Sequence, residues 1–356
     1  MLVGMAIGCD RQEGGSTAPP APGKPPVTLG VAIERVTPLP PDRMTHVAPT
    51  GSGLLFWVQE ADGGGRETVF SMSDGGLPTA TKFSNVDILE ATGQAGGTGS
   101  IQSLEVGPDG RLYYYFAGGK GRQMSAAFGY FAPETGRPVV LADAATLARE
   151  SRLGDSLALA RGTIVRSGNV IWLWLRHPDG YALLSVEFRR AEKAPRRTFE
   201  RVGGAAGEVR LTSMREDLAP GRGNALIYFD RATGRVWALS ALGEASALTD
   251  LGDLPKETTA PSPDERGRLI VFAPEGNAIR DTPETPIVPT TQQTDYPALV
   301  ILDGARRTTL GKRTMTAPAT LNVRALSPQR LYRDRSGWLM YDAPTGELLR
   351  LKVVER

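Results

Sequence analysis

A hairpin motif that recurs three times constrains the fold of this chain more than any other feature. In each copy an aromatic residue stands four positions before the threonine of a Thr-Gly pair, and a leucine follows the glycine by five; the copies are 131–141, 229–239 and 341–351. Glycine tolerates the positive φ angles that tight turns between antiparallel strands require. We therefore expect each copy to be a β-hairpin that places its aromatic residue and its leucine in a hydrophobic core.

Weaker hairpins fill the intervals between these copies. We take the three clear hairpins and the three weaker ones as equivalent turns, whose glycines are then about 56 residues apart on average. These glycines are Gly65, Gly136, Gly180, Gly234, Gly304 and Gly346. A second motif, in which a proline-containing turn joins two strands, occurs at 106–116 and 261–272 and in shorter form at 327–332. A repeat of about four strands with this period indicates a β-propeller.

We predict an all-β fold, a six-bladed β-propeller, with seven or eight blades as the alternative. The expected blades are 43–90, 101–145, 155–202, 207–252, 257–312 and 320–354. A strand at 27–36 is expected to pair with the last blade and close the ring, which would remove exposed strand edges. Residues 144–150 favour a short helix in a connection. The long segment 273–296 holds four prolines, and we expect it to contact a partner.

Two of these segments resemble known propeller families. The run Pro-Asp-Gly-Arg-Leu-Tyr at 108–113 is similar to NHL-type and lactonase-type six-bladed repeats. The run 229–237 resembles the Asp-x-x-Thr-Gly turn of PQQ-type repeats, although Trp237 comes one residue earlier than in that family. The resemblance is architectural and covers most of residues 43–354. As an alternative to a binding role, it implies a calcium-dependent lactonase-like hydrolase or a quinone-dependent sugar dehydrogenase-like enzyme.

The acidic residues do not form a recognisable catalytic or metal-binding pattern. A lactonase-like calcium site needs several oxygen ligands that converge at the mouth of the channel. Three acids lie near the starts of blades, but nothing in the sequence brings them together; they are Glu105, Asp155 and Asp217. Three further acids occupy Pro-Asp-x turns, where an aspartate bonds to the backbone two residues later; they are Asp109, Asp179 and Asp264. We predict no catalytic residue, no metal site and no cofactor, with Ca²⁺ as the alternative.

The remaining candidate groups favour structural roles. His46 and His177 are the two histidines and Cys9 is the single cysteine, so an intrachain disulfide and a cysteine-based zinc site are excluded. Trp172 and Trp174 flank Leu173, so both indoles fall on one face of a strand, where packing between blades needs bulk.

The first thirty residues indicate a lipid-anchored export signal followed by a spacer. An apolar run ends in Gly8-Cys9, as in a bacterial lipobox, with Ala6 where leucine is usual. We expect a signal remnant at 1–9 with lipid on Cys9, a disordered tether rich in proline and glycine at 10–30, and the propeller domain at 31–356. This organisation predicts the bacterial cell envelope, on its periplasmic or extracellular face.

The charge pattern narrows the choice of partners. The formal net charge is +2 and no long basic stripe is present, so a nucleic-acid partner is not expected. The densest basic stretch, 189–197, contains a proline and a glutamate and favours a solvated loop. We therefore predict a non-catalytic binding or scaffold module, attached to the membrane through Cys9, whose partner is a protein or a glycan of the cell envelope.

Overall fold

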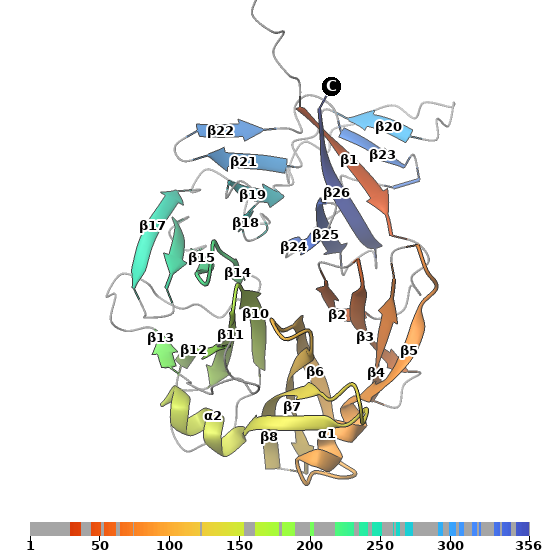
Figure 1. The fold of residues 1–356 in the computed structure, drawn as a ribbon, viewed down its shortest axis with the longest axis vertical. Helices are drawn as coiled ribbons and strands as arrows, with labels where there is room; N and C mark the ends of the chain where they lie inside the picture. The colour runs from red at the N-terminus through yellow and green to blue at the C-terminus, as the bar shows by residue number, and fades with distance from the viewer. Residues whose placement is uncertain are drawn as a thin grey trace, which may run out of the picture.

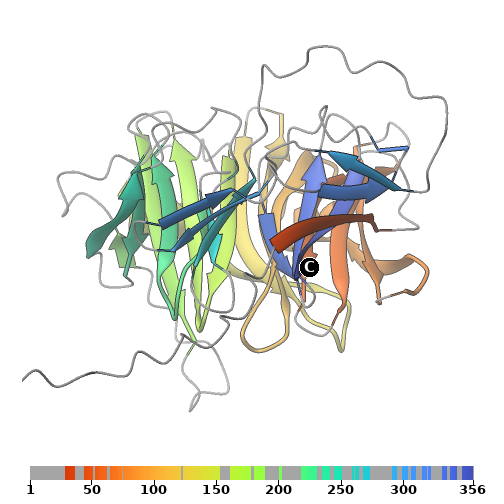
Figure 2. The same ribbon diagram turned by 90° about the horizontal axis from the view of Figure 1, so that it is seen from above.

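In the computed structural model, six β-sheets stand around a common axis (Figure 1). Seen from the side, most strands of the green, yellow and orange part of the ring run between its two faces (Figure 2). The structure describes residues 29–36, 44–50, 53–61, 65–73, 75–121, 123–152, 161–177, 180–188, 200–202, 218–230, 235–240, 244–250, 259, 261–263, 268–272, 291–294, 299–303, 306–309, 315–318, 320–321, 331–334, 337–342 and 347–355.

Blades 1 to 3 are antiparallel sheets of four strands in chain order. Blade 1 contains β2 (Met44–Pro49), β3 (Leu55–Ala61), β4 (Arg66–Met72) and β5 (Thr79–Ser84). Blade 2 contains β6 (Thr98–Val106), β7 (Leu112–Lys120), β8 (Gln123–Phe131) and β9 (Pro138–Asp143). Blade 3 contains β10 (Arg161–Ser167), β11 (Val170–His177), β12 (Gly180–Glu187) and β13 (Glu200–Val202).

Blades 4 to 6 follow the same plan with two departures. The second and third strands of blade 5 are not consecutive in the chain, and blade 6 takes its fourth strand from the N-terminal part of the chain. Blade 4 contains β14 (Leu218–Pro220), β15 (Leu226–Asp230), β16 (Arg235–Leu239) and β17 (Ala245–Asp250). Blade 5 contains β18 (Ser262–Pro263), β19 (Leu269–Phe272), β21 (Leu299–Asp303) and β22 (Arg306–Thr309). Blade 6 begins with β24 (Leu331–Asp334), β25 (Gly337–Asp342) and β26 (Glu347–Glu355), and its next strand is β1 (Leu29–Arg35).

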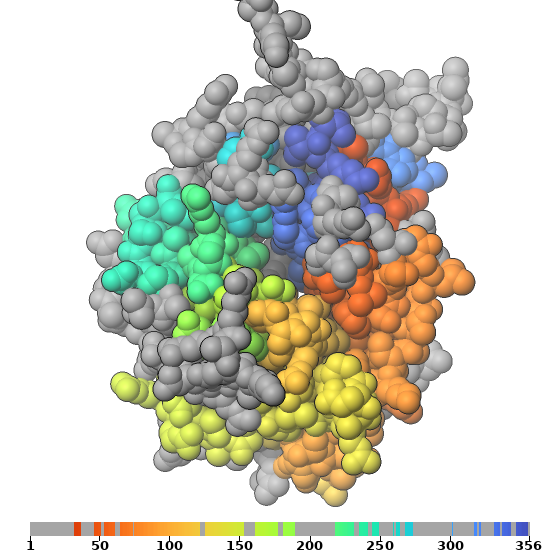
Figure 3. All heavy atoms as spheres, in the orientation of Figure 1, coloured from red at the N-terminus to blue at the C-terminus, as the bar shows by residue number. Residues whose placement is uncertain are grey.

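The first strands of the six blades form a closed circle. Each of them contacts the first strands of both neighbouring blades, and the contact of β24 with β2 completes the ring. In the space-filling view the blades follow one another around the ring in chain order (Figure 3). Each predicted blade range contains the main strands of one of these sheets, although the range 257–312 also contains a strand, 291–294, that belongs to blade 6. The prediction of a six-bladed β-propeller is therefore confirmed.

Strand β1 closes the ring and is enclosed on both edges. It pairs antiparallel with β26 over seven residue pairs, from Leu29 opposite Glu355 to Arg35 opposite Leu349. The predicted closure by the N-terminal strand is thus confirmed. On its other edge β1 pairs in parallel with β23 (Met315–Pro318), which pairs in turn with β20 (Thr291–Thr294). Blade 6 consequently has six strands rather than four.

Strand β20 places part of the long segment 273–296 at the outer edge of blade 6 (Figure 1). The chain leaves blade 5 after β19, adds β20 to blade 6, and returns to blade 5 as β21. This route ties the two blades together, which the sequence pattern did not predict. Residues 273–290, 295 and 296 lie outside the described residues, so the expected partner contact there stays a prediction.

The three clear copies of the hairpin motif do not occupy equivalent turns, so that expectation was wrong. The copies at 229–239 and 341–351 join the second and third strands of their blades, whereas the copy at 131–141 joins the third and fourth. The turn between the first and second strands repeats more evenly. Its positive-φ glycines in blades 1 to 4 are 57, 58 and 55 residues apart, at Gly53, Gly110, Gly168 and Gly223.

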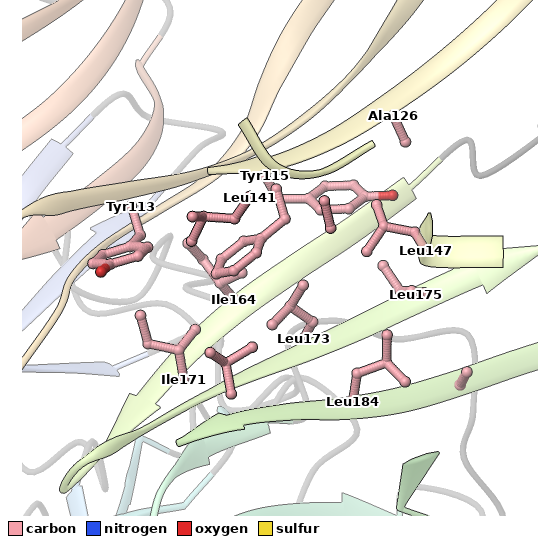
Figure 4. Packing of buried hydrophobic residues seen from close by; sticks show 14 of the residues in the cluster. Tyr113, Tyr115, Ala126, Leu141, Leu147, Ile164, Ile171, Leu173, Leu175 and Leu184 are labelled. Carbon is pink, nitrogen blue, oxygen red and sulfur yellow. The ribbon is translucent and has the colours of Figure 1, made fainter. Parts of the chain in front are cut away.

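The hydrophobic cores lie between neighbouring blades. Strand β7 carries four consecutive, fully buried aromatic residues, and side chains alternate between the two faces of a strand. Tyr113 and Tyr115 therefore pack towards blade 3, while Tyr114 and Phe116 pack towards blade 1. Figure 4 shows Tyr113 and Tyr115 above the aliphatic side chains of β10 and β11. A Cβ atom at Gly162 would clash with the Tyr115 ring, so this close approach requires glycine.

Two short helices leave the ends of the fourth strands of blades 1 and 2. Helix α1 (Asn85–Ala91) begins after Ser84, whose side chain accepts a hydrogen bond from the Asp87 amide. Helix α2 (Ala144–Ser151) begins after Asp143, which accepts one from the Thr146 amide. The predicted helix at 144–150 is confirmed, and α1 was not predicted. Within the described part of the chain, neither helix has the length and apolar character needed to cross a lipid bilayer.

Candidate functional site

The structure assigns Asp109, the best-defined acidic candidate, to its own turn. One carboxylate oxygen accepts a hydrogen bond from the Arg111 amide at 3.1 Å, and the other accepts one from the Tyr113 hydroxyl at 2.9 Å. The first bond is the one that an aspartate in such a turn is expected to make. The turn interpretation is therefore confirmed for Asp109. Glu105 lies half-buried on β6, opposite Tyr113 of β7.

Several predicted positions lie outside the described residues. These are Cys9, Asp155, Asp179, Asp217, Asp264 and the basic stretch 189–197. The side chain of His177, at the end of β11, is outside them as well. His46 lies half-buried on β2. Among the described residues, no three histidine, cysteine, aspartate or glutamate side chains are grouped so that they could hold a metal ion.

The tryptophan pair of blade 3 has the packing role that its spacing predicted. Trp172 and Trp174 are almost fully buried and lie in one core with Tyr228 and Trp237 of blade 4. The Trp172 indole N–H donates a hydrogen bond to the backbone oxygen of Asn224 at 3.2 Å. Both indoles therefore belong to the contact between blades 3 and 4.

Hydroxyl groups join the inner strands of blades 2 and 3. Ser103 Oγ on β6 accepts a hydrogen bond from the Ile164 amide on β10 at 3.2 Å and lies 3.2 Å from Thr163 Oγ1. All three residues are buried, so these bonds satisfy polar groups that have left water. The two blades are thus held in register close to the axis without a charged group.

A buried carboxyl group, Glu67, lies at the contact between blades 1 and 2. Its Oε2 accepts a hydrogen bond from the Ile101 amide of β6 at 2.6 Å, and its own amide donates to Asn85 Oδ1 at 2.9 Å. The Asn85 amide group donates at 2.7 Å to the backbone oxygens of Gly65 and Gly99. Glu67 and Asn85 therefore connect β4, α1 and β6.

Burial gives Glu67 an unusual titration. The pKa of Glu67 is raised from 4.5 to about 7, chiefly because burial removes hydration from the charged form. The Glu60 carboxylate, directly opposite on β3, contributes to this rise. The Ile101 amide favours the charged form and opposes both effects. A perturbed carboxyl group can mark a catalytic site. Here its side chain is 5% exposed and bonded to the backbone of the next blade, so it acts as a link between blades.

A groove at the rim of blade 2 is the candidate binding site. It has a volume of about 360 Å³, within the ~300–1,000 Å³ typical of small ligand sites. It lies between the end of α1 and the start of α2, over β8 and β9, and we call it the α1–α2 groove. Its lining consists of Ala91, Thr92, Ser125, Val140, Asp143, Ala144 and Ala145.

The polar side chains of the α1–α2 groove all end in oxygen atoms. The hydrogen bonds from the Thr146 amide and side chain hold the pKa of Asp143 below its usual value, so its carboxylate is charged at neutral pH. The Thr92 hydroxyl donates its hydrogen to the Ile88 backbone oxygen at 2.8 Å, which leaves its lone pairs for a ligand. The Ser125 hydroxyl forms no side-chain hydrogen bond within the described residues.

Neither Glu67 nor this groove was predicted from the sequence. Glu67 lies opposite Glu60 across a hairpin, and alternation alone does not say which face of an outer strand is covered. The groove lies between two connections that are far apart in the chain, at 91–92 and at 143–145. The available signals were the two capping residues, Ser84 and Asp143, at the ends of their strands.

By its fold this chain is a six-bladed β-propeller. No protein-family model matches it, and no curated protein sequence does. Similar solved structures include a virginiamycin B lyase from Staphylococcus aureus, at 10% identity and a TM-score of 0.43, with 92% of this chain and 100% of that chain covered.

Two further similar structures are of proteins with other roles. A luciferin-regenerating enzyme has 11% identity and a TM-score of 0.48, with 91% of this chain and 95% of that one covered. The lectin SapL1 has 11% identity and a TM-score of 0.41, with 74% and 77% covered. At such low identity and superposition, these likenesses say nothing about what this chain binds or catalyses.

Proposed function

We propose that this chain is a non-catalytic binding module of the bacterial cell envelope, held at a membrane by lipid on Cys9. The expected tether at 10–30, shortened at its end because β1 begins at Leu29, would act as the spacer. Its proline and glycine content favours an extended chain. The partner would be a protein or a glycan on the periplasmic or extracellular side. The Gly8-Cys9 pair and the low-complexity run after it support this placement.

The observation that carries the proposal is the enclosure of β1. A tether attached before Leu29 enters the propeller through a strand that is hydrogen-bonded to β26 on one edge and to β23 on the other. Seven residue pairs on the β26 side would share any pull along the strand. A spacer joined to such a strand can hold the ring away from a membrane without opening it.

Arg35 strengthens this attachment at the far end of β1. Its guanidinium forms two hydrogen bonds with the Glu347 carboxylate, at 3.1 and 2.7 Å, and one with Thr320 Oγ1 at 2.7 Å. These contacts tie β1 to the start of β26 and to the connection between β23 and β24. Three segments distant in sequence thus meet at one side chain.

Binding is favoured over catalysis because several of the described acids make structural contacts. Asp109 accepts hydrogen bonds from the Arg111 amide and the Tyr113 hydroxyl of its own turn. Buried Asp334 pairs with Arg350 at 2.8 Å across blade 6. A carboxylate that is committed to such contacts has less freedom to take up a metal ion or a substrate proton.

Two experiments test the proposal. Metabolic labelling with a fatty-acid analogue should mark the wild-type chain and not Cys9→Ser, and equal labelling of both would remove the lipid anchor. Cross-linking in cells followed by purification should recover one reproducible envelope partner. A chain that instead binds Ca²⁺ and hydrolyses a lactone, or oxidises a sugar with a bound quinone, would be an enzyme, and the binding-module proposal would be wrong.

A further inference from the structure

We propose that the α1–α2 groove binds the ammonium end of a lysine side chain on a partner protein. This inference rests on the proposed binding function and names the chemistry of one of its contacts. It follows from three properties of the groove, which are the identity of its polar groups, its local charge and the nature of its walls.

The polar side chains of the groove match the donors of an ammonium group. Asp143 presents a charged carboxylate, and Thr92 presents a hydroxyl oxygen whose hydrogen is already donated to Ile88. Ser125 supplies a further hydroxyl oxygen that can accept. A lysine ammonium has three N–H donors and no acceptor, so three oxygen groups from three separate elements suit it.

The local charge also favours a cation. Among the described residues, no lysine, arginine or histidine lines the groove. Helix α1 carries Asp87 and Glu90, and its last turn has no basic residue. The positive end of the α2 dipole opposes a cation, but the full negative charge of Asp143 lies directly on it. Farther along α2, Arg149 pairs with Glu150 at 3.0 Å.

The walls of the groove fit an aliphatic stem. Ala91, Val140, Ala144 and Ala145 are small and aliphatic, so they can cover the methylene groups of a lysine. An aromatic ring, on which a sugar or a methylated ammonium would stack, is absent from the described lining. The groove is partly open at the surface, so a side chain can enter while its backbone stays outside.

Methyl NMR of the full chain tests this with n-butylammonium chloride as the side-chain mimic. The alanine methyl signals of Ala91, Ala144 and Ala145 should shift and saturate at an affinity on the order of millimolar, while n-butanol should leave them unchanged. Asp143→Asn should weaken binding about tenfold, because it removes the charge from the hydrogen bond. Asparagine caps helices as well as aspartate does, so α2 should remain folded.

Asp87→Asn is the matched control, because it removes a nearby negative charge that does not line the groove. We expect it to change the affinity less than about twofold, as a partly screened surface charge. The absence of methyl shifts, equal shifts with butanol, or equal binding by Asp143→Asn would each overturn the proposal.

The source of the amine is tested with a peptide containing one lysine, the same peptide acetylated on that lysine, and putrescine. Binding of the first and not of the second supports a lysine contact. Binding of putrescine alone would overturn it in favour of a free amine. If Asp143→Asn still captures the envelope partner as well as wild type, the groove proposal is wrong and the binding function stands. If no partner is recovered but the lysine peptide binds, the proposed function fails and the groove chemistry stands.

Discussion

Arg35 and Glu347 form a two-point ion pair that fastens the first described strand of the chain to the last one. Their closest atoms, Arg35 Nη2 and Glu347 Oε1, are 2.7 Å apart, and both side chains are about one-third exposed. They are 312 positions apart in sequence, so the pair exists only when the ring is closed. It is therefore a local reporter of closure.

Removing this pair should loosen the ring. We expect Arg35→Ala to lower the free energy of unfolding by about 1 kcal/mol, because a partly exposed bidentate pair and a bond to Thr320 are lost together. Lys352→Ala breaks the more exposed pair with Glu34 on the same strands and should cost less than about 0.5 kcal/mol. Urea denaturation measures both. Equal losses would show that Arg35 has no special part in closure.

Glu67 should make stability fall as the pH rises. Its pKa in the folded chain is raised from 4.5 to about 7, so between these values the unfolded chain releases a proton that the folded chain keeps. The stabilising contribution of Glu67, at most ~3 kcal/mol, is therefore fully present below about pH 4.5 and is lost as the pH rises to about 7.

Glu67→Gln tests this titration, because glutamine keeps an oxygen for the Ile101 amide and does not ionise. Urea unfolding at pH 5 and pH 8 should show the variant gaining on wild type by about 1–3 kcal/mol at the higher pH. Glu60→Gln, on the half-buried neighbour, should give a smaller gain. A difference between wild type and Glu67→Gln that is the same at both pH values would rule out a raised pKa at this position.

The two tyrosines of the core between blades 2 and 3 should respond in opposite ways to loss of their hydroxyls. The Tyr115 hydroxyl is fully buried and has no hydrogen-bond partner within the described residues, so Tyr115→Phe should keep stability or raise it by up to about 1 kcal/mol. Tyr113→Phe removes the bond to Asp109 and should lower stability by about 1 kcal/mol. Thermal unfolding compares the pair. A lower melting temperature for Tyr115→Phe would indicate a partner for that hydroxyl.

Gly162 should tolerate no side chain. Gly162→Ala puts a methyl group into the Tyr115 ring across the contact between blades 2 and 3, and we expect a loss of about 1–3 kcal/mol from overpacking. The double variant with Tyr115→Leu should recover part of this loss, because a smaller side chain leaves room. Denaturant midpoints of the two single variants and the double variant measure the coupling. Additive losses would mean that the ring and the glycine do not compete for space.

The sequence by itself determined the all-β class, the approximate blades, the closing strand and the packing of Trp172 and Trp174. These features depend on local alternation and turn chemistry, which are written in neighbouring residues. The sequence did not separate equivalent from non-equivalent turns. A Thr-Gly hairpin has the same local chemistry at 131–141 as at 229–239, although the two join different strands of their blades.

Tertiary structure decided everything that depends on which blade faces which. The enclosure of β1 by β23, the desolvation of Glu67 and the α1–α2 groove each join segments that lie apart in the chain. Burial, and with it the pKa of Glu67, is set by the neighbouring blade and not by the residues beside it in sequence. The physical reason is that a propeller makes its cores and its surfaces between repeats, while a sequence pattern describes one repeat at a time.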